Sequence, residues 1–272
     1  MKLISILIAY VLTGLAMFAY GLNHEEELLD CGVFDSSAEA VKDTIASDTV
    51  SDPNNITTLS LYHDTLFLRR TVNTSENYTS HNYVYIDTNR SSKYYSWLTS
   101  FEFSESNIQS LETYGVNDVK CADDLKKNEF SGLAKNWLPV YSFNGQYYLY
   151  KPSDFGNAGR RIISDNYFIF WYMDGPMPLE ILAAKPQVKN RNVLVYMTLE
   201  NYPKQCLIHC VDDKRQLYVF EYTQGENKRN YYLYTPAENA QSFDMIVNTG
   251  NEKAWEYNFD PINFEKLLGI EN

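Results

Sequence analysis

The chain of 272 residues carries a formal net charge of −12, and its aromatic content of 15% includes 23 tyrosines. This acidity argues against nucleic acid or an anionic lipid surface as a partner, because both bind clustered Lys and Arg. A hydrophobic content of 44% supports a substantial core. The length allows one large β domain or two small ones.

Residues 1–21 have the layout of a secretory signal peptide. Lys2 gives a positive charge, an apolar run follows, and the small side chains of Ala19 and Gly21 form a cleavage site. An uncleaved anchor is the alternative, since the run approaches the roughly 20 apolar residues that span a bilayer. The charged segment 24–27 favours cleavage. We therefore expect an exported protein, secreted or periplasmic, with no membrane span in the mature chain.

A polar lead-in is predicted over residues 22–56. Ser36 opens a capping box, and one short helix is expected to follow it to about Ser47. A β-rich domain is expected over 57–272, either undivided or as two halves, 57–130 and 131–272. Four Asn-x-Ser/Thr sequons would be glycosylated in a eukaryotic secretory pathway and carry no meaning in a bacterium: Asn55, Asn73, Asn77 and Asn89.

The first part of the β domain mixes strands with helical segments. Alternating leucines at 59–61 and 66–68 predict a hairpin around His63-Asp64. The polar stretch 71–80 is expected to be a loop. Strands are predicted at 83–86 and 94–103, and helical segments at 106–115 and 122–127.

Strand patterns dominate from residue 137. Asn144-Gly145 lies between strand-forming residues and predicts a type I′ hairpin, since both turn positions need positive φ. The run 167–173 is apolar on both faces, which indicates a strand covered on both sides. Further strands are predicted at 162–163, 179–183, 193–199, 205–211, 217–222, 231–234 and 243–247, with a short helix from about 262 to 268.

These short strands predict a mainly β fold: an antiparallel barrel, sandwich or meander with a few short helices. A duplicated β unit is a further interpretation, because the string Tyr147–Pro152 returns with one change as Tyr231–Pro236. Chance repetition in a tyrosine-rich chain is the alternative explanation of this match.

The sequence contains no Gly-x-Ser-x-Gly elbow, Gly-rich phosphate loop or His-Glu-x-x-His motif. Cys206, His209 and Cys210 are zinc-ligand types. On a strand, however, His209 faces away from both cysteines, so we expect no metal site there and no cofactor. A catalytic pair of carboxylates, as in glycosidases, meets in space and not in sequence, so this alternative stays open and no carboxylate is assigned to catalysis. Those beside strands or turns are Asp154, Asp165, Asp174, Glu180 and Asp260.

The tyrosine-rich strands predict a binding surface. If Leu149 faces the core, then Tyr148 and Tyr150 face outward, and the same alternation places Tyr232 and Tyr234 outward. Exposed aromatic rings suit sugars or protein partners, whereas the alternative is that they cover a second sheet. We expect a non-enzymatic, extracytoplasmic binding or accessory protein with a glycan or protein partner. The alternatives are an exported glycan hydrolase and a structural surface protein.

Cys206 and Cys210 are not expected to pair with each other. Residues four apart on a strand are separated by about 13 Å. A disulfide needs Cα atoms within about 7 Å. Any disulfide would therefore join one of them to Cys31, Cys121 or another chain.

We predict that the mature protein begins near Leu22 and is found outside the cytoplasm, because residues 1–21 have the signal layout. Intact-mass analysis of the native protein should give the mass of residues 22–272. A soluble, full-length cytoplasmic species would contradict this prediction.

Overall fold

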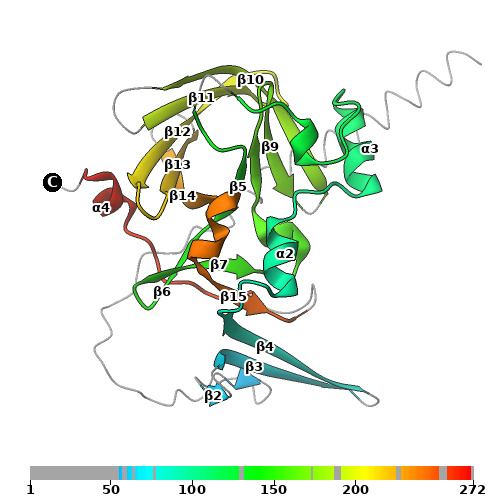
Figure 1. Cartoon of the computed structure of the whole chain (residues 1–272), viewed down its shortest axis with the longest axis vertical. Coiled ribbons are helices and arrows are strands. Elements are labelled where there is room, and N and C mark those ends of the chain that lie inside the picture. The colour runs from blue at the N-terminus through cyan, green and yellow to red at the C-terminus, as the bar shows by residue number, and fades with distance from the viewer. Residues whose placement is uncertain are drawn as a thin grey trace, which may run out of the picture. The chain divides into compact units, whose positions relative to one another are not determined.

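The computed structural model describes residues 55–56, 60–62, 65–75, 78–128, 132–172, 174–186, 191–224, 228–250 and 256–270. All of them belong to one compact unit, Asp48–Asn272. The predicted signal segment and the predicted helix at 36–47 lie outside the described residues. The mainly β prediction is confirmed, because the unit contains a closed antiparallel barrel, a mixed sheet and short helices (Figure 1).

Eight strands close the barrel in the order β10-β11-β12-β13-β14-β5-β8-β9. The strands β8 to β14 follow one another along the chain, and β5 closes the ring by pairing with both β14 and β8. The barrel strands are β5 (Asn136–Pro139), β8 (Arg161–Ile163), β9 (Tyr167–Tyr172), β10 (Gly175–Pro186), β11 (Arg191–Met197), β12 (Pro203–Asp212), β13 (Leu217–Gln224) and β14 (Lys228–Pro236).

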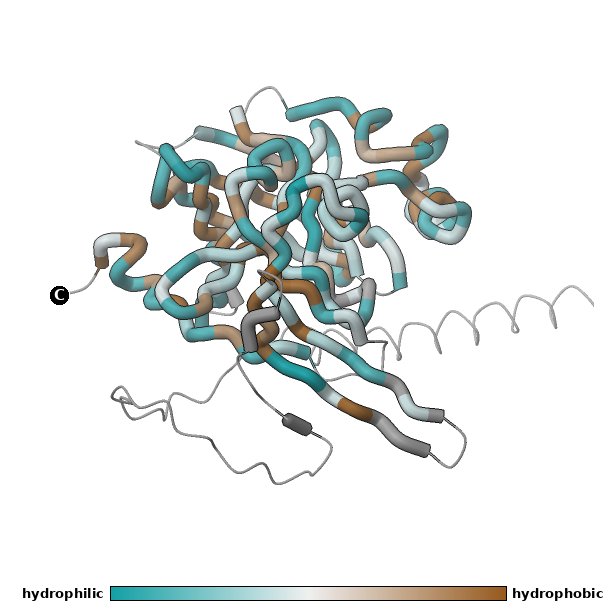
Figure 2. Tube along the Cα trace, turned by 60° about the horizontal axis from the view of Figure 1, so that its bottom comes forward, coloured by the Kyte–Doolittle hydropathy of each residue, from teal (hydrophilic) through white to brown (hydrophobic). Residues whose placement is uncertain are grey.

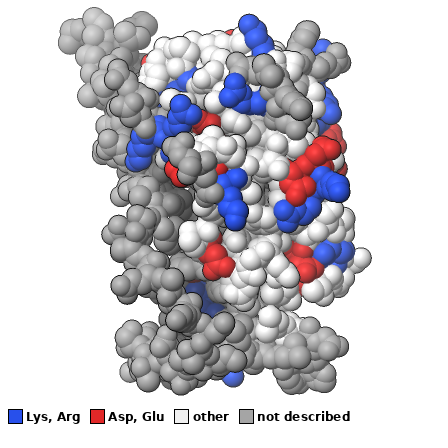
Figure 3. Space-filling view, turned by 90° about the vertical axis from the view of Figure 1, so that its left-hand side faces the viewer, with Lys and Arg blue, Asp and Glu red and all other residues white. Residues whose placement is uncertain are grey.

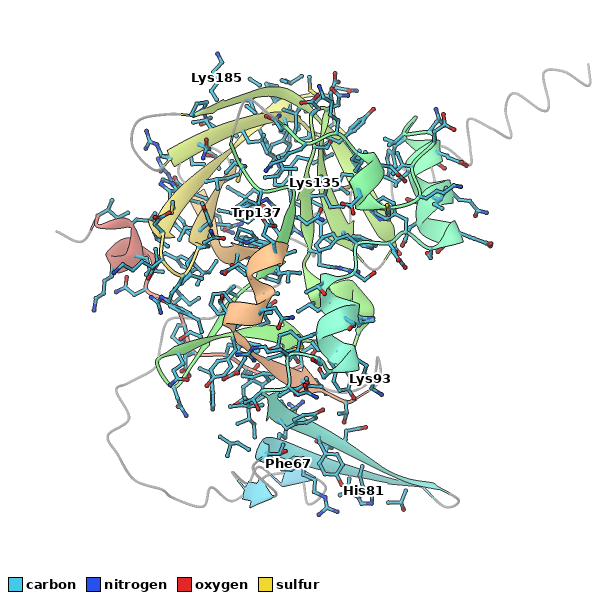
Figure 4. The ribbon with its side chains drawn as sticks, viewed as in Figure 1. Phe67, His81, Lys93, Lys135, Trp137 and Lys185 are labelled. Atoms are coloured by element: carbon cyan, nitrogen blue, oxygen red, sulfur yellow. The ribbon has the colours of Figure 1, made fainter. Side chains whose placement is uncertain are left out.

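Side chains of the barrel strands alternate between the lumen and the outer surface, and much of the wall is apolar on both sides. On β9, Phe168 and Phe170 belong to the cluster that fills the lumen. Their neighbours Ile169 and Trp171 belong to the main core outside the barrel. Trp137 of β5 is fully buried with the lumen cluster (Figure 4). The predicted burial of β9 on both sides is confirmed.

The second sheet is mixed and has the strand order β1-β3-β4-β15-β7-β6, with β2 paired to β3. Its β15–β7 contact is parallel, and the other described contacts in the sheet are antiparallel. The strands are β1 (Asn55–Ile56), β2 (Ser60–Tyr62), β3 (Thr65–Ser75), β4 (Tyr78–Asp87), β6 (Tyr141–Phe143), β7 (Gln146–Lys151) and β15 (Asp244–Asn248).

Two predicted hairpins are confirmed. β6 and β7 are joined by Asn144 and Gly145, whose φ angles of 49° and 73° are both positive, as a type I′ turn requires. β2 and β3 pair with Leu61 opposite Leu66. Local turn and alternation signals therefore identified both pairs of strands correctly.

Residues 71–80 were expected to form a loop, and this prediction is wrong. Residues 71–75 continue β3 and residues 78–80 begin β4, and together they form a two-stranded ribbon in which Asn73 pairs with Ser80. Figure 2 shows this ribbon leaving the rest of the sheet, with hydrophilic residues along much of its length. Its polar composition hid it, because the strand prediction relied on apolar alternation, which this stretch lacks.

The strand predicted at 94–103 is also wrong, because helix α2 (Lys93–Thr99) occupies this segment. Ser92 caps the helix by accepting a hydrogen bond from the Tyr95 backbone N–H. Tyr95 and Leu98 are buried on one stripe. Helical spacing and a serine cap therefore outweigh the strand preference of the aromatic residues here.

The other helical predictions hold where the structure describes them. Helix α3 (Glu105–Thr113) begins with a capping box between Ser104 and Asn107. The remaining short helices are η1 (Ala122–Asp124), η2 (Phe155–Ala158), η3 (Ala237–Ser242) and α4 (Phe264–Leu268).

The two similar strings, Tyr147–Pro152 and Tyr231–Pro236, lie on strands of different sheets. β7 pairs with β6 and β15 in the mixed sheet. β14 pairs with β13 and β5 in the barrel. The similarity of the strings therefore has no counterpart in the sheet topology.

The main core lies outside the barrel and is shared by its outer wall, the mixed sheet and the helices. Leu149 of β7 is fully buried in this core, whereas Leu182 of β10 is 45% exposed. These two leucines, both on strands, give a matched comparison of burial.

We predict that Leu149→Ala lowers the free energy of unfolding by about 2–5 kcal/mol, because it leaves a cavity in the core. The control Leu182→Ala should change it by no more than about 0.5 kcal/mol. Urea denaturation monitored by tryptophan fluorescence measures both. Equal effects of the two substitutions would contradict the assigned core.

Candidate functional site

Tyr148 and Tyr150 do lie on the face of β7 opposite Leu149, but that face is covered. The two rings are only 7% and 5% exposed, so the expectation that they form an exposed ligand platform is wrong. Phe259 packs against Tyr150 at 4.9 Å between ring centroids, and the Tyr150 hydroxyl donates a hydrogen bond to Glu256 at 2.5 Å. A segment that follows β15 therefore covers these rings.

Tyr232 and Tyr234 are directed into the barrel lumen instead of toward solvent. Tyr234 is 2% exposed, and its hydroxyl donates a hydrogen bond to the Gly159 carbonyl at 3.2 Å. Tyr232 is half-buried and packs edge-on against Tyr222. Since the barrel is closed, the face expected to be outward is its lumen, and the expected exposed platform is wrong here too.

The strand predicted around Cys206 is confirmed as β12, which places Cys206 and His209 on opposite sides of the barrel wall. Cys206 is buried in the lumen cluster. His209 Nε2 lies 2.8 Å from a carboxylate oxygen of Glu221 on the outer side. Cys206 and Cys210 are free thiols. Among the described residues, no group of His, Cys, Asp or Glu is arranged to hold a metal ion.

Three of the carboxylates considered for a catalytic pair make structural contacts. Asp154 accepts a hydrogen bond from the Gly156 backbone N–H, Asp260 accepts one from the Asn144 N–H in the β6–β7 turn, and Asp165 forms an ion pair with Lys126 at 3.1 Å. Each of these three carboxylates therefore has a contact that holds chain segments in place.

A groove of about 740 Å³ opens where α2, the start of α3 and the residue before β8 come together. This volume is typical of small-molecule sites, which span about 300–1,000 Å³. Helix α2 contributes Lys93, Ser96 and Trp97 to its lining. The other lining residues are Ser100, Glu102, Phe103, Ser104, Ser106, Asn107 and Arg160.

Arg160 forms one wall of the groove, and aromatic rings surround its guanidinium. The guanidinium carbon lies 4.0 Å from the ring centroid of Trp171 and 5.5 Å from that of Phe101. Its Nη1 donates a hydrogen bond to the Ser100 carbonyl at 2.5 Å. Burial lowers the pKa of Arg160 to about 10, which still leaves the side chain charged at neutral pH. The groove therefore contains a positive charge, the Arg160 guanidinium, whose position is fixed by these contacts.

Trp97 supplies an aromatic surface to the groove and is only partly buried. Its ring centroid lies 5.7 Å from the Arg160 guanidinium and 5.9 Å from Lys151 Nζ. Lys151 is itself fixed, because its Nζ donates a hydrogen bond to the Asn248 carbonyl at 3.0 Å. Two cation–π contacts thus restrain the orientation of the Trp97 ring.

The sequence did not reveal this groove, because residues 94–103 were interpreted as a strand. On a strand, Lys93 and Trp97 would be more than 10 Å apart, at about 3.3 Å per residue. On α2 they are neighbours, since residues three and four apart share a helix face. The signal that could have found it was Ser92 directly before residues with helical spacing.

The groove is positive within an acidic chain. Its lining has two cations, Lys93 and Arg160, and one acid, Glu102, so its net charge is +1 against −12 for the chain. Figure 4 shows Lys93 at the beginning of α2. On the face shown in Figure 3, by contrast, acidic and basic side chains are mixed across uncharged surface. The local excess of positive charge favours a negatively charged ligand.

Comparison of the chain with protein-family models, curated proteins and solved structures found no match. None of the helices in the described part of the chain is both long and apolar enough to cross a bilayer.

We predict that Cys206 resists alkylation in the native protein, whereas the partly exposed Cys121 reacts. Cys206 is fully buried, and burial raises the pKa of its thiol well above the ordinary value, so little reactive thiolate forms. Iodoacetamide labelling with peptide mass spectrometry, before and after unfolding, measures this difference. Equal native labelling of both cysteines would contradict the position of Cys206 in the lumen.

Proposed function

We propose that this is a non-enzymatic binding protein that acts outside the cytoplasm and takes an acidic saccharide in the groove between α2 and α3. One observation carries the proposal: a single groove combines a restrained tryptophan ring, hydroxyl and amide groups, and an excess of positive charge. Export is supported by the signal-like layout of residues 1–21.

The shape and chemistry of a sugar ring match this lining. A pyranose has an apolar C–H face, which packs on a flat aromatic surface such as Trp97. Its hydroxyl groups need donors and acceptors at the edge, and the Ser96 hydroxyl and the Asn107 amide line the same groove.

The charge of the groove selects among sugars. The exposed Lys93 and the buried Arg160 both carry a positive charge that attracts a carboxylate, and a hydrogen bond to an ionised group is stronger than a neutral one. Glu102 would oppose a ligand with several negative charges. The lining therefore fits a sugar with one carboxylate, such as a uronic acid.

Nuclear magnetic resonance titration with glucuronic acid and glucose tests this proposal. We expect tighter binding of glucuronic acid and a loss of at least about tenfold in its affinity for Trp97→Ala, which corresponds to about 1.4 kcal/mol. Lys93→Gln should weaken binding of glucuronic acid and leave glucose binding unchanged.

The matched control is Tyr114→Ala, which removes an aromatic ring that is 45% exposed and does not line the groove. It should bind both sugars as the unmodified protein does. The proposal fails if Trp97→Ala binds glucuronic acid as well as Tyr114→Ala does, or if neither sugar perturbs the groove signals.

A further inference from the structure

Two consecutive arginines lie on opposite sides of the barrel wall. Arg160 lines the external groove, whereas the next side chain, Arg161 on β8, enters the lumen. The Arg161 guanidinium carbon lies 4.3 Å from the Phe170 ring centroid and 5.9 Å from that of Tyr234, and both rings belong to the lumen cluster. Arg161 therefore places a full positive charge inside an apolar, aromatic lumen.

This charge has no acidic partner within the described part of the chain. Arg161 Nη1 donates hydrogen bonds to the carbonyls of Gly159 and Arg160, at 3.1 and 2.9 Å. Glu221 precedes the lumen residue Tyr222 on β13, but its carboxylate faces the outer side. There it pairs with His209 and Arg229.

The lumen does not supply a negative charge of its own at neutral pH. Burial raises the pKa of Tyr222, Tyr234 and Cys206 above the ordinary values, although the charge of Arg161 opposes this shift. The phenols and the thiol therefore stay protonated. Arginine itself is not deprotonated in proteins. The described lumen side chains thus leave Arg161 uncompensated.

Two hydrogen-bonding groups in this lumen lack a well-placed partner. Arg161 Nε and the Tyr222 hydroxyl are both buried and have no partner at good hydrogen-bond geometry, although the Arg161 and Tyr222 side chains lie close enough to interact with each other. A buried unpaired charge and buried unsatisfied donors are each unfavourable. Both groups can donate to one acceptor, and a negatively charged acceptor would also neutralise the guanidinium.

We propose that the lumen binds one small monovalent anion, of the size of formate or chloride, at Arg161 Nε and the Tyr222 hydroxyl. The size limit follows from the architecture, since an eight-stranded barrel has room for side chains or for one small ligand. Here aromatic rings such as Phe168 and Phe220, both fully buried, occupy much of that space. This site is separate from the external groove and its saccharide.

Thermal unfolding in sodium formate, sodium chloride and sodium gluconate at one ionic strength tests the proposal. Gluconate is too large to enter the lumen and controls for screening. An anion that binds only the folded state raises stability with the logarithm of its concentration. We expect the Tm to rise as formate or chloride replaces gluconate at constant ionic strength. Equal Tm values in all three salts would overturn the proposal.

Two variants locate the effect. Tyr222→Phe removes one donor and should weaken the anion affinity about fivefold, the value of one hydrogen bond. Arg161→Met should abolish the dependence of the Tm on the anion. In gluconate this variant should be no less stable than the unmodified protein, because the substitution removes the buried charge. The control Arg229→Met, on the outer side of the barrel, should keep the dependence. If Tyr222→Phe binds the anion with the affinity of the unmodified protein, the proposed site is wrong.

A crystal grown in sodium bromide gives a second measurement on the unmodified protein. We expect anomalous scattering from one bromide beside Arg161 Nε in the lumen. A water molecule alone at that position, or no density there, would overturn the proposal even if Arg161→Met failed to fold.

Discussion

Closure of the barrel by β5 is the constraint on which the rest of the unit depends. This short strand, Asn136–Pro139, pairs with β14 on one side and β8 on the other, so neither of these strands is left with an open edge. Closure also gives the wall an inside and an outside. Trp137 fills the lumen, while the next residue, Leu138, belongs to the main core.

A wall buried on both sides leaves few places for charge, and the start of β8 places two arginines there in succession, Arg160 just before the strand and Arg161 as its first residue. Gly159 connects them to the preceding turn with a φ of 61°, a left-handed conformation that glycine adopts without strain. Its carbonyl accepts hydrogen bonds from Arg161 Nη1 and from the Tyr234 hydroxyl. One turn therefore fixes the lumen side of the wall and sets Arg160 on the other side.

Sequence reasoning succeeded where the structural cause is local. Asn144 and Gly145 determine their own turn, and the continuous apolar run of β9 records burial on both faces. It failed where another segment decides the outcome. Alternation along β7 correctly separated Tyr150 from Leu149, but it could not show that Phe259, far along the chain, covers the second face.

The groove was even harder to predict from the sequence. Each of its parts has a local cause: serine caps begin α2 and α3, and alternation on the strand turns Arg160 outward. These parts come together, however, only because Trp97 packs beside Arg160. No periodicity in the sequence indicates a contact between residues so far apart in the chain. Arg160 also shows how the fold retains a buried cation, because the faces of Trp97, Phe101 and Trp171 attract it. Arg161 has aromatic contacts as well, but its guanidinium lies among the rings of the lumen, whereas Arg160 lines the external groove, and this difference in position separates the two arginines.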